Sequence, residues 1–130
     1  MFFRIETDKP QVPIFEQIRA QVIFGVAAGS LRPGELIPSV RELASHVRVH
    51  PNTVAKAYQE LEREKVLITR RGKGMEVSPD APELCRALRQ EIVRKRLQGA
   101  LQEAVSSSLS AEEIRRIVDE ELARLNGRVR

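Results

Sequence analysis

Polar and cationic side chains gather at three places in the first half of the chain. Ser39 and Arg41 form the first, a polar stretch after residue 49 forms the second, and a cationic turn around residue 72 forms the third. Hydroxyl, amide and cationic groups in such positions suit binding to phosphates and base edges. The candidate binding residues are Ser39, Arg41, His50, Asn52, Thr53, Lys56, Arg70, Arg71, Gly72 and Lys73.

The first two places are predicted to open consecutive helices. Ser39 and Glu42 match the capping box, in which the hydroxyl and the carboxylate each accept a backbone N–H, and they predict a helix over about 39–46. Pro51 suits the first turn of a helix, and the apolar spacing from Val54 onwards predicts that this helix reaches about residue 64. The short connection between the two is typical of a helix-turn-helix.

The third place lies on a predicted hairpin. Two β-prone runs flank the turn, and Gly72 and Gly74 can supply the positive φ that a tight turn requires. Side chains at the front of the second helix can reach the major groove, and a cationic turn can reach a minor groove or its phosphates. The order of these elements therefore predicts a winged helix-turn-helix that binds double-stranded DNA.

The rest of the chain is predicted to be mostly helical. Phe2–Ile5 is a short β-prone piece, and apolar residues four apart predict a helix over about 13–28. Prolines mark residues 79–82 as a linker. Two further amphipathic helices are predicted over about 83–106 and 111–125.

The last predicted helix has boundary signals of its own. Ser110 and Glu113 form a second capping box, and an Asn-Gly pair at 126–127 predicts the end. The expected fold class is mostly α with a small β-hairpin: a winged helix-turn-helix domain over 1–78, followed by a two-helix region over 83–130. Two helices of this size rarely form a stable core alone. We therefore expect residues 83–130 to form a homodimer with a second copy.

Composition limits the function classes. The 130 residues are 42% hydrophobic and 31% charged, which is typical of a globular protein, and the net charge of +4 is compatible with a nucleic-acid partner. A single cysteine, Cys85, excludes an intrachain disulfide and a cysteine-based zinc site. Because neither a signal peptide nor an apolar run of about 20 residues is present, we expect no membrane insertion and a cytoplasmic location.

Other interpretations remain open for each feature. Asn52 and Thr53 could act only as helix caps, the cationic turn could serve solubility, and Arg41 could pair with a nearby carboxylate. The three features in this order favour DNA binding, with a protein-interaction module on a winged-helix scaffold as the alternative. No enzyme, cofactor or metal site is expected, because His46 and His50 belong to no recognisable catalytic constellation.

The same segments resemble a known family. The runs "LRPGELIPSVRELA", "PNTVAKAYQELE" and "RRGKG", within about residues 1–78, are similar to the DNA-binding domain of GntR-family bacterial transcription regulators, and the short tail resembles the YtrA subfamily. The resemblance implies a dimeric repressor on an inverted-repeat operator, with the tail as its dimerisation element. It implies DNA contacts by Arg41, by residues 50–56 and by the turn at 71–73. A small-molecule effector stays open as a partner.

Two positions depart from the family pattern. Lys65 stands where the family usually has a left-handed glycine after the second helix, so we expect either local strain of about 1 kcal/mol or a differently closed helix. The hairpin ends in Gly74-Met75-Glu76-Val77 instead of the common Gly-Thr-Phe-Val. The missing phenylalanine bears on how the hairpin packs, not on its positive charge.

Overall fold

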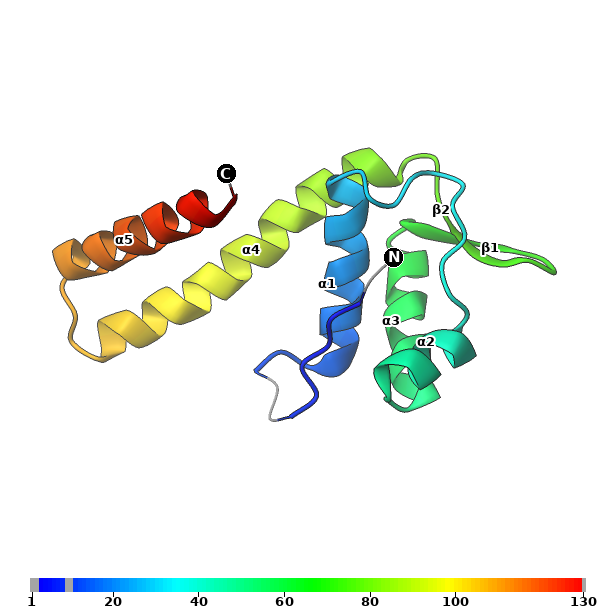
Figure 1. The fold of residues 1–130 in the computed structure, drawn as a ribbon, viewed down its shortest axis with the longest axis horizontal. Helices are drawn as coiled ribbons and strands as arrows, with labels where there is room; N and C mark the ends of the chain where they lie inside the picture. Colours follow the sequence, from blue (N-terminus) through cyan, green and yellow to red (C-terminus); the bar gives the residue numbers. More distant parts are fainter. Residues whose placement is uncertain (1–2, 9–10, 130) are drawn as a thin grey trace. The chain divides into compact units, whose positions relative to one another are not determined.

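A computed structural model describes residues 3–8 and 11–129, with residues 128 and 129 described by their backbone alone. The chain divides into two compact units, residues 1–92 and 93–130, and the long helix α4 (Ala81–Ser106) contributes to both (Figure 1). Each unit is described by itself. The predicted fold class is confirmed: five helices and one two-stranded antiparallel hairpin account for the regular structure of the described residues.

The first unit is built around helix α3 (Pro51–Arg63), which packs against α1 (Ile14–Ala27), α2 (Val40–Val47) and strand β1 (Leu67–Arg70). The apolar stripe of α3 is fully buried, as its spacing predicts, and it meets the buried face of α1. The core of the unit consists mainly of aliphatic side chains, since the chain has few aromatics. Its largest fully buried members are Ile18, Ile23, Leu31, Leu43, Leu61 and Leu67.

The segment before α1 lies along that helix without forming a strand. The side chain of Gln17 accepts a hydrogen bond from the backbone of Glu6 at 2.7 Å and donates one back at 2.9 Å. Gln21 pairs in the same two ways with the backbone of Arg4, and Phe3 is buried in the core. Phe2 lies outside the described residues. The β-prone piece is therefore an extended arm whose backbone bonds to glutamine amides.

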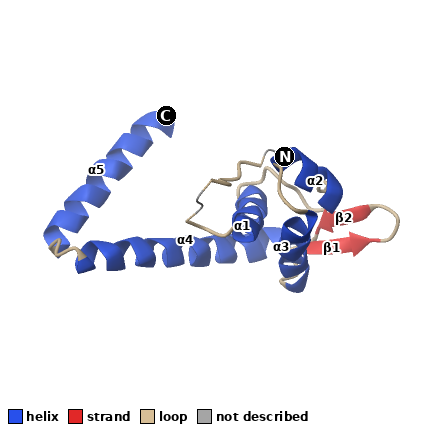
Figure 2. Cartoon of the chain, turned by 90° about the horizontal axis from the view of Figure 1, so that it is seen from below, coloured by secondary structure: helices blue, strands red, loops and turns tan. Residues whose placement is uncertain are grey.

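The hairpin pairs β1 with β2 (Gly74–Val77) in the register Leu67 with Val77 and Arg70 with Gly74. Figure 2 shows it projecting beyond the helices of the first unit, with its turn at the tip. The loop at 34–37 runs along the other edge of β2, where the N–H of Gly34 donates to the carbonyl of Val77 at 2.8 Å. Both sides of β2 are thus paired at its base, which anchors the projecting turn.

Lys65 closes α3 in the left-handed conformation, at φ 67°. The N–H of Val66 donates to the carbonyl of Leu61, as in the usual closure by glycine. The carbonyl of Lys65 accepts a hydrogen bond from the hydroxyl of Ser78 at 2.7 Å. The helix is therefore closed in the left-handed conformation by a lysine, which costs more strain than glycine would because lysine has a Cβ.

Helix α4 begins earlier than the sequence indicates and extends the first unit. The residues expected to be a linker, 79–82, already include its start at Ala81. Pro82 fits there because the first turn of a helix has no acceptor for its N–H. Ala81, Cys85 and Ile92 are buried in the core of the first unit, so this compact unit extends to residue 92.

The second unit contains the end of α4 and α5 (Ala111–Val129). The turn between them has Ser108 at φ 68°, and the predicted capping box is present, with the N–H of Glu113 bonded to the Ser110 hydroxyl at 3.1 Å. The expected stop at 126–127 is wrong, because the helix continues to Val129. Apolar side chains of both helices remain exposed, and they are Val93, Leu97, Leu101, Val105, Ile117, Val118, Leu122 and Leu125.

Candidate nucleic-acid interface

The start of α2 is fixed by two sets of hydrogen bonds. Ser39 is its N-cap, where the hydroxyl accepts the N–H of Glu42 and the Glu42 carboxylate accepts the N–H of Ser39, both at 3.1 Å. The bond from the backbone N–H of Ser39 lowers the pKa of the Glu42 carboxyl, and the Ser39 hydroxyl is a smaller cause in the same direction. The Tyr58 hydroxyl donates to the carbonyl of Pro38 at 2.7 Å. The loop that leads into α2 is thereby tied to α3.

The turn between α2 and α3 is closed by Arg48, which adopts a left-handed conformation at φ 58°. The N–H of Val49 then donates to the carbonyl of Ala44 at 3.0 Å. His50 is the N-cap of α3, and its Nδ1 accepts the N–H of Asn52 at 3.0 Å. This bond requires an unprotonated Nδ1, so the neutral ring has its proton on Nε2, which points away from the cap. His46 belongs to α2 and His50 precedes α3, so the two do not share a helix.

The outward face of α3 presents the predicted polar residues. Asn52 and Lys56 are exposed, whereas Thr53 is half-buried. The ammonium of Lys56 lies 3.9 Å from the centre of the Phe15 ring on α1, a cation–π contact. Lys56 is therefore held at the α1 side of the helix, while Asn52 occupies the first turn.

The hairpin turn presents its charges unequally. Gly72 and Gly74 have φ of 76° and 109°, as the tight turn requires, and the N–H of Lys73 donates to the carbonyl of Arg70 at 2.9 Å. Arg71 and Lys73 are exposed. Arg70 forms an ion pair with Glu76 on the neighbouring strand. Two of the three predicted cations thus lack an anionic partner among the residues that the structure describes.

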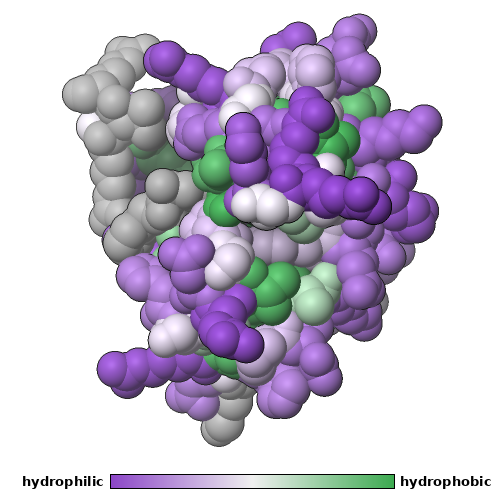
Figure 3. Space-filling model, turned by 90° about the vertical axis from the view of Figure 1, so that its right-hand side faces the viewer, coloured by the Kyte–Doolittle hydropathy of each residue, from purple (hydrophilic) through white to green (hydrophobic). Residues whose placement is uncertain are grey.

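The hairpin and the start of α2 meet at a hollow of about 350 Å³. Ser39 and Glu42 line it from α2, while Lys73 and Gly74 line it from the hairpin. The Arg41 side chain is exposed on α2 and makes no ion pair within the described part of the chain. The first and third places of the sequence are therefore neighbours in space. The side on which the hairpin turn projects in Figure 1 is viewed in Figure 3, where its surface is largely hydrophilic with small apolar spots.

Two partners of candidate residues, and one contact beside Ser39, are absent from the sequence prediction. Glu76 pairs with Arg70, Phe15 lies under Lys56, and Tyr58 holds Pro38. The first pairing follows from the strand register, but the other two depend on how helices pack. Tyr58 belongs to the buried stripe of α3, and the sequence has no signal for the direction of its hydroxyl.

Comparison with known proteins gives the family. A family model described as "Bacterial regulatory proteins, gntR family" matches residues 14–77, which include all the candidate residues. Over 119 residues the chain is 34% identical to the HTH-type transcriptional repressor YtrA of Bacillus subtilis (strain 168), and the match covers 92% of each chain. The chain belongs to the GntR family.

Solved structures agree with this GntR assignment. A protein described as a transcriptional antiterminator from Listeria monocytogenes EGD-e is 40% identical, with a TM-score of 0.68 and coverage of 93% of this chain and 90% of that one. YtrA from Sulfolobus acidocaldarius, a GntR-family transcription factor, is 28% identical with a TM-score of 0.55, and the match covers 95% of this chain and 99% of that one.

The chain is therefore a winged-helix, DNA-binding transcription regulator of the GntR family, and its relatives are regulators and not enzymes. Within the described residues, no group of three or more His, Cys, Asp or Glu side chains could hold a metal ion. None of the helices in that part of the chain is long and apolar enough to cross a bilayer.

Proposed function

We propose that this GntR regulator is a homodimeric repressor in which each winged-helix unit reads one half of an inverted-repeat operator. The observation that supports this most is that the start of α2 and the hairpin turn line one hollow. A two-fold symmetric dimer matches a two-fold symmetric DNA site. A regulator of this kind acts on the chromosome, so we place it in the cytoplasm.

The proposed DNA contacts divide by type. Asn52 and Thr53 at the front of α3 are proposed to reach base edges, because the N-terminal residues of a recognition helix enter the major groove. His50, through its outward Nε2, and Lys56 are proposed to contact phosphates beside them. Ser39, Arg41 and the hairpin residues Arg70, Arg71, Gly72 and Lys73 complete the proposed surface.

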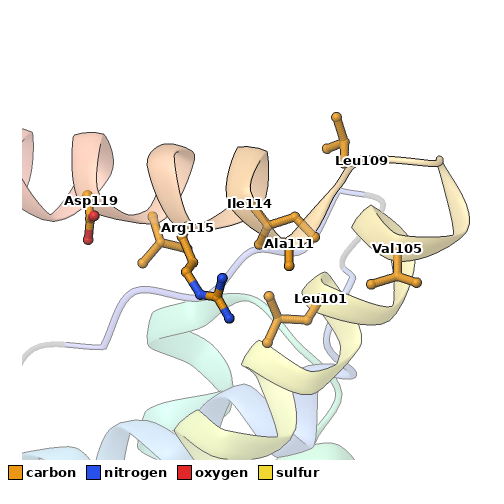
Figure 4. Close-up of a pocket in the computed structure, with 8 residues that line it drawn as sticks. Leu101, Val105, Leu109, Ala111, Ile114, Arg115 and Asp119 are labelled. Atoms are coloured by element: carbon orange, nitrogen blue, oxygen red, sulfur yellow. The ribbon is translucent and has the colours of Figure 1, made fainter.

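The second unit supports dimer formation through its exposed apolar side chains. Figure 4 shows Leu101 and Val105 of α4 and Ile114 of α5 around an open hollow of about 670 Å³. Arg115 and Asp119 are the charged residues that line it. A unit of two helices cannot cover this surface alone, and a second copy offers the same apolar side chains in return. We propose that the second copy fills this hollow.

DNA selection tests the proposed function. The purified protein should recover an inverted repeat from a random duplex library. On the recovered duplex, Asn52→Ala should relax base preference at one position per half-site at a cost of about 1–3 kcal/mol. Arg71→Ala with Lys73→Ala should weaken binding to all sequences and make the salt dependence less steep by about one to two per half-site. Arg86→Ala removes an exposed cation from α4 and serves as the control. Recovery of no sequence, together with a protein partner in a pull-down, would favour the protein-interaction module.

Point variants in the second unit test the dimer. Leu101→Glu with Leu122→Glu places charges on the exposed apolar surface and should give a monomer in analytical ultracentrifugation. The helix content should be retained. Gln98→Glu with Gln102→Glu adds the same two charges at neighbouring exposed polar positions and should leave the dimer intact. A dimer that persists in the double variant would refute the assignment.

A small-molecule effector is tested on the same dimer by the shift in melting temperature with candidate ligands.

A further inference from the structure

One cation of the hairpin differs from the other two in its surroundings. Arg70 donates from its Nε to a carboxylate oxygen of Glu76. Glu76 stands opposite Ile68 in the strand register, and Arg70 lies two residues further along β1. Residues two apart on a strand share a face, so Arg70 and Glu76 are diagonal neighbours on the same side of the hairpin. The register therefore fixes this ion pair.

The two partners are buried to different extents. The side chain of Glu76 is 13% exposed, whereas that of Arg70 is 57% exposed. Ile68 stands opposite Glu76 on one side, and Leu36 bridges to it on the other. Glu76 thus lies on β2, which is paired with β1 on one side and with the loop at Leu36 on the other, and its neighbours on both sides are apolar. Removal of its cation would leave a largely desolvated charge without compensation, which is strongly unfavourable.

Arg71 and Lys73 lie under no such constraint. Both are exposed, and neither has an ion-pair partner among the residues that the structure describes. A DNA phosphate can recruit them without breaking an existing interaction. The same phosphate would compete with Glu76 for the positive charge of Arg70, because the Nε of Arg70 already donates to that carboxylate.

We propose that Glu76 retains Arg70 when the regulator binds DNA, so that Arg70 holds the hairpin in shape while Arg71 and Lys73 supply the phosphate contacts. This proposal rests on the proposed function, because it assumes that the hairpin reaches DNA. It makes Arg70 a positioning residue and removes it from the set of direct contacts. Glu76 then limits DNA affinity by withholding one cation.

The salt dependence of binding to the selected duplex tests the proposal. Log K falls as log salt rises, and each phosphate contact makes this slope steeper by about 0.9; the changes in steepness below are counted per half-site of the proposed dimer. Arg70→Gln combined with Glu76→Gln replaces the ion pair by two neutral amides and should leave the slope unchanged. Arg71→Gln should make the slope less steep by about 0.9. Glu76→Gln alone should release Arg70, make the slope steeper by about 0.9 and tighten binding about eightfold per half-site at roughly 0.1 M salt.

A second carboxylate controls for the loss of negative charge near DNA. Glu62 on α3 accepts a hydrogen bond from the Thr69 hydroxyl at 2.6 Å and has no ion-pair partner in the described chain. Glu62→Gln should change the slope much less than Glu76→Gln. Circular dichroism melts would show whether each variant folds. If Glu76→Gln alone does not fold, the slope of the double Gln variant still shows whether Arg70 contacts DNA.

Three results would overturn the proposal. The double Gln variant could lose about 0.9 of the slope, as Arg71→Gln does, which would show that Arg70 contacts DNA. Glu76→Gln could fold and leave the slope unchanged. Glu62→Gln could make it steeper by as much as Glu76→Gln, which would leave only a general charge effect. Absence of DNA binding by the wild-type protein is a different outcome, and it would refute the proposed function itself.

Discussion

A fragment that ends at Pro79 should be unstable, although it contains every predicted element of the winged helix. The missing segment includes Ala81, Cys85 and Ile92, which are buried in the core of the first unit, and the partly buried Leu88. Burial of an isoleucine or leucine side chain stabilises by about 1.5–3 kcal/mol, and that of a smaller side chain by less. The four together contribute about 4–6 kcal/mol, which is close to the whole stability of a small domain.

The assay is a thermal melt followed by circular dichroism on two fragments, residues 1–79 and 1–96. The longer fragment retains all the α4 side chains that the first core buries and should melt cooperatively. The shorter one should melt at least about 20 °C lower or be unfolded at room temperature. In the longer fragment, Ile92→Ala should cost about 2–4 kcal/mol, whereas Val93→Ala, at an exposed neighbour, should cost less than about 0.5 kcal/mol.

Equal melting temperatures for the two fragments would refute the reasoning. Such a result would mean that the first turns of α4 add nothing to the core and that the unit ends near residue 78. If the prediction holds, a truncation at Pro79 cannot test dimerisation, because it also removes part of the DNA-binding core. For this reason the dimer test uses point variants of the complete chain.

Three further predictions concern single side chains. Lys65→Gly should raise the free energy of unfolding by about 1 kcal/mol in urea denaturation, because glycine adopts the left-handed conformation without strain; no gain would mean that the lysine is unstrained. Burial raises the pKa of the Cys85 thiol from 9.0 to about 11, so its contribution to stability is complete below pH 9.0 and is lost as pH rises towards about 11. Cys85→Ala should therefore flatten the fall in melting temperature over that range, and an equally steep fall would contradict the assignment. Tyr58→Phe should cost about 1–2 kcal/mol in the same urea assay, because the Pro38 carbonyl loses its donor; an unchanged midpoint would show that water replaces the hydroxyl.

Local signals in the sequence predicted the elements that form the candidate site. The capping boxes at Ser39 and Ser110 appear as expected, because each depends only on residues three apart. These features are set within one turn of the backbone, so a sequence without a structure is sufficient to find them.

Other features depended on packing that the sequence does not specify. Two prolines indicated a linker at 79–82, but Pro82 is compatible with a first helical turn, and burial of Ala81 and Cys85 selects the helix. Gly127 favours a helix end, yet α5 continues past it. The pairing of Arg70 with Glu76 required the register of the hairpin. In each case a tertiary contact, or its absence, outweighed a local preference.

The pairing of Gln17 and Gln21 with the arm has a consequence for how this protein can vary in evolution. Both amides bond to the peptide backbone of residues 4 and 6, and the identities of the side chains at those two positions do not enter the pairing. Substitutions at residue 6 should drift among orthologues while the arm keeps its course. Selection should instead fall on the two glutamines and on Phe3, whose side chain occupies the core. Sequence conservation within the arm alone would therefore underestimate how well the position of the arm on α1 is conserved among orthologues.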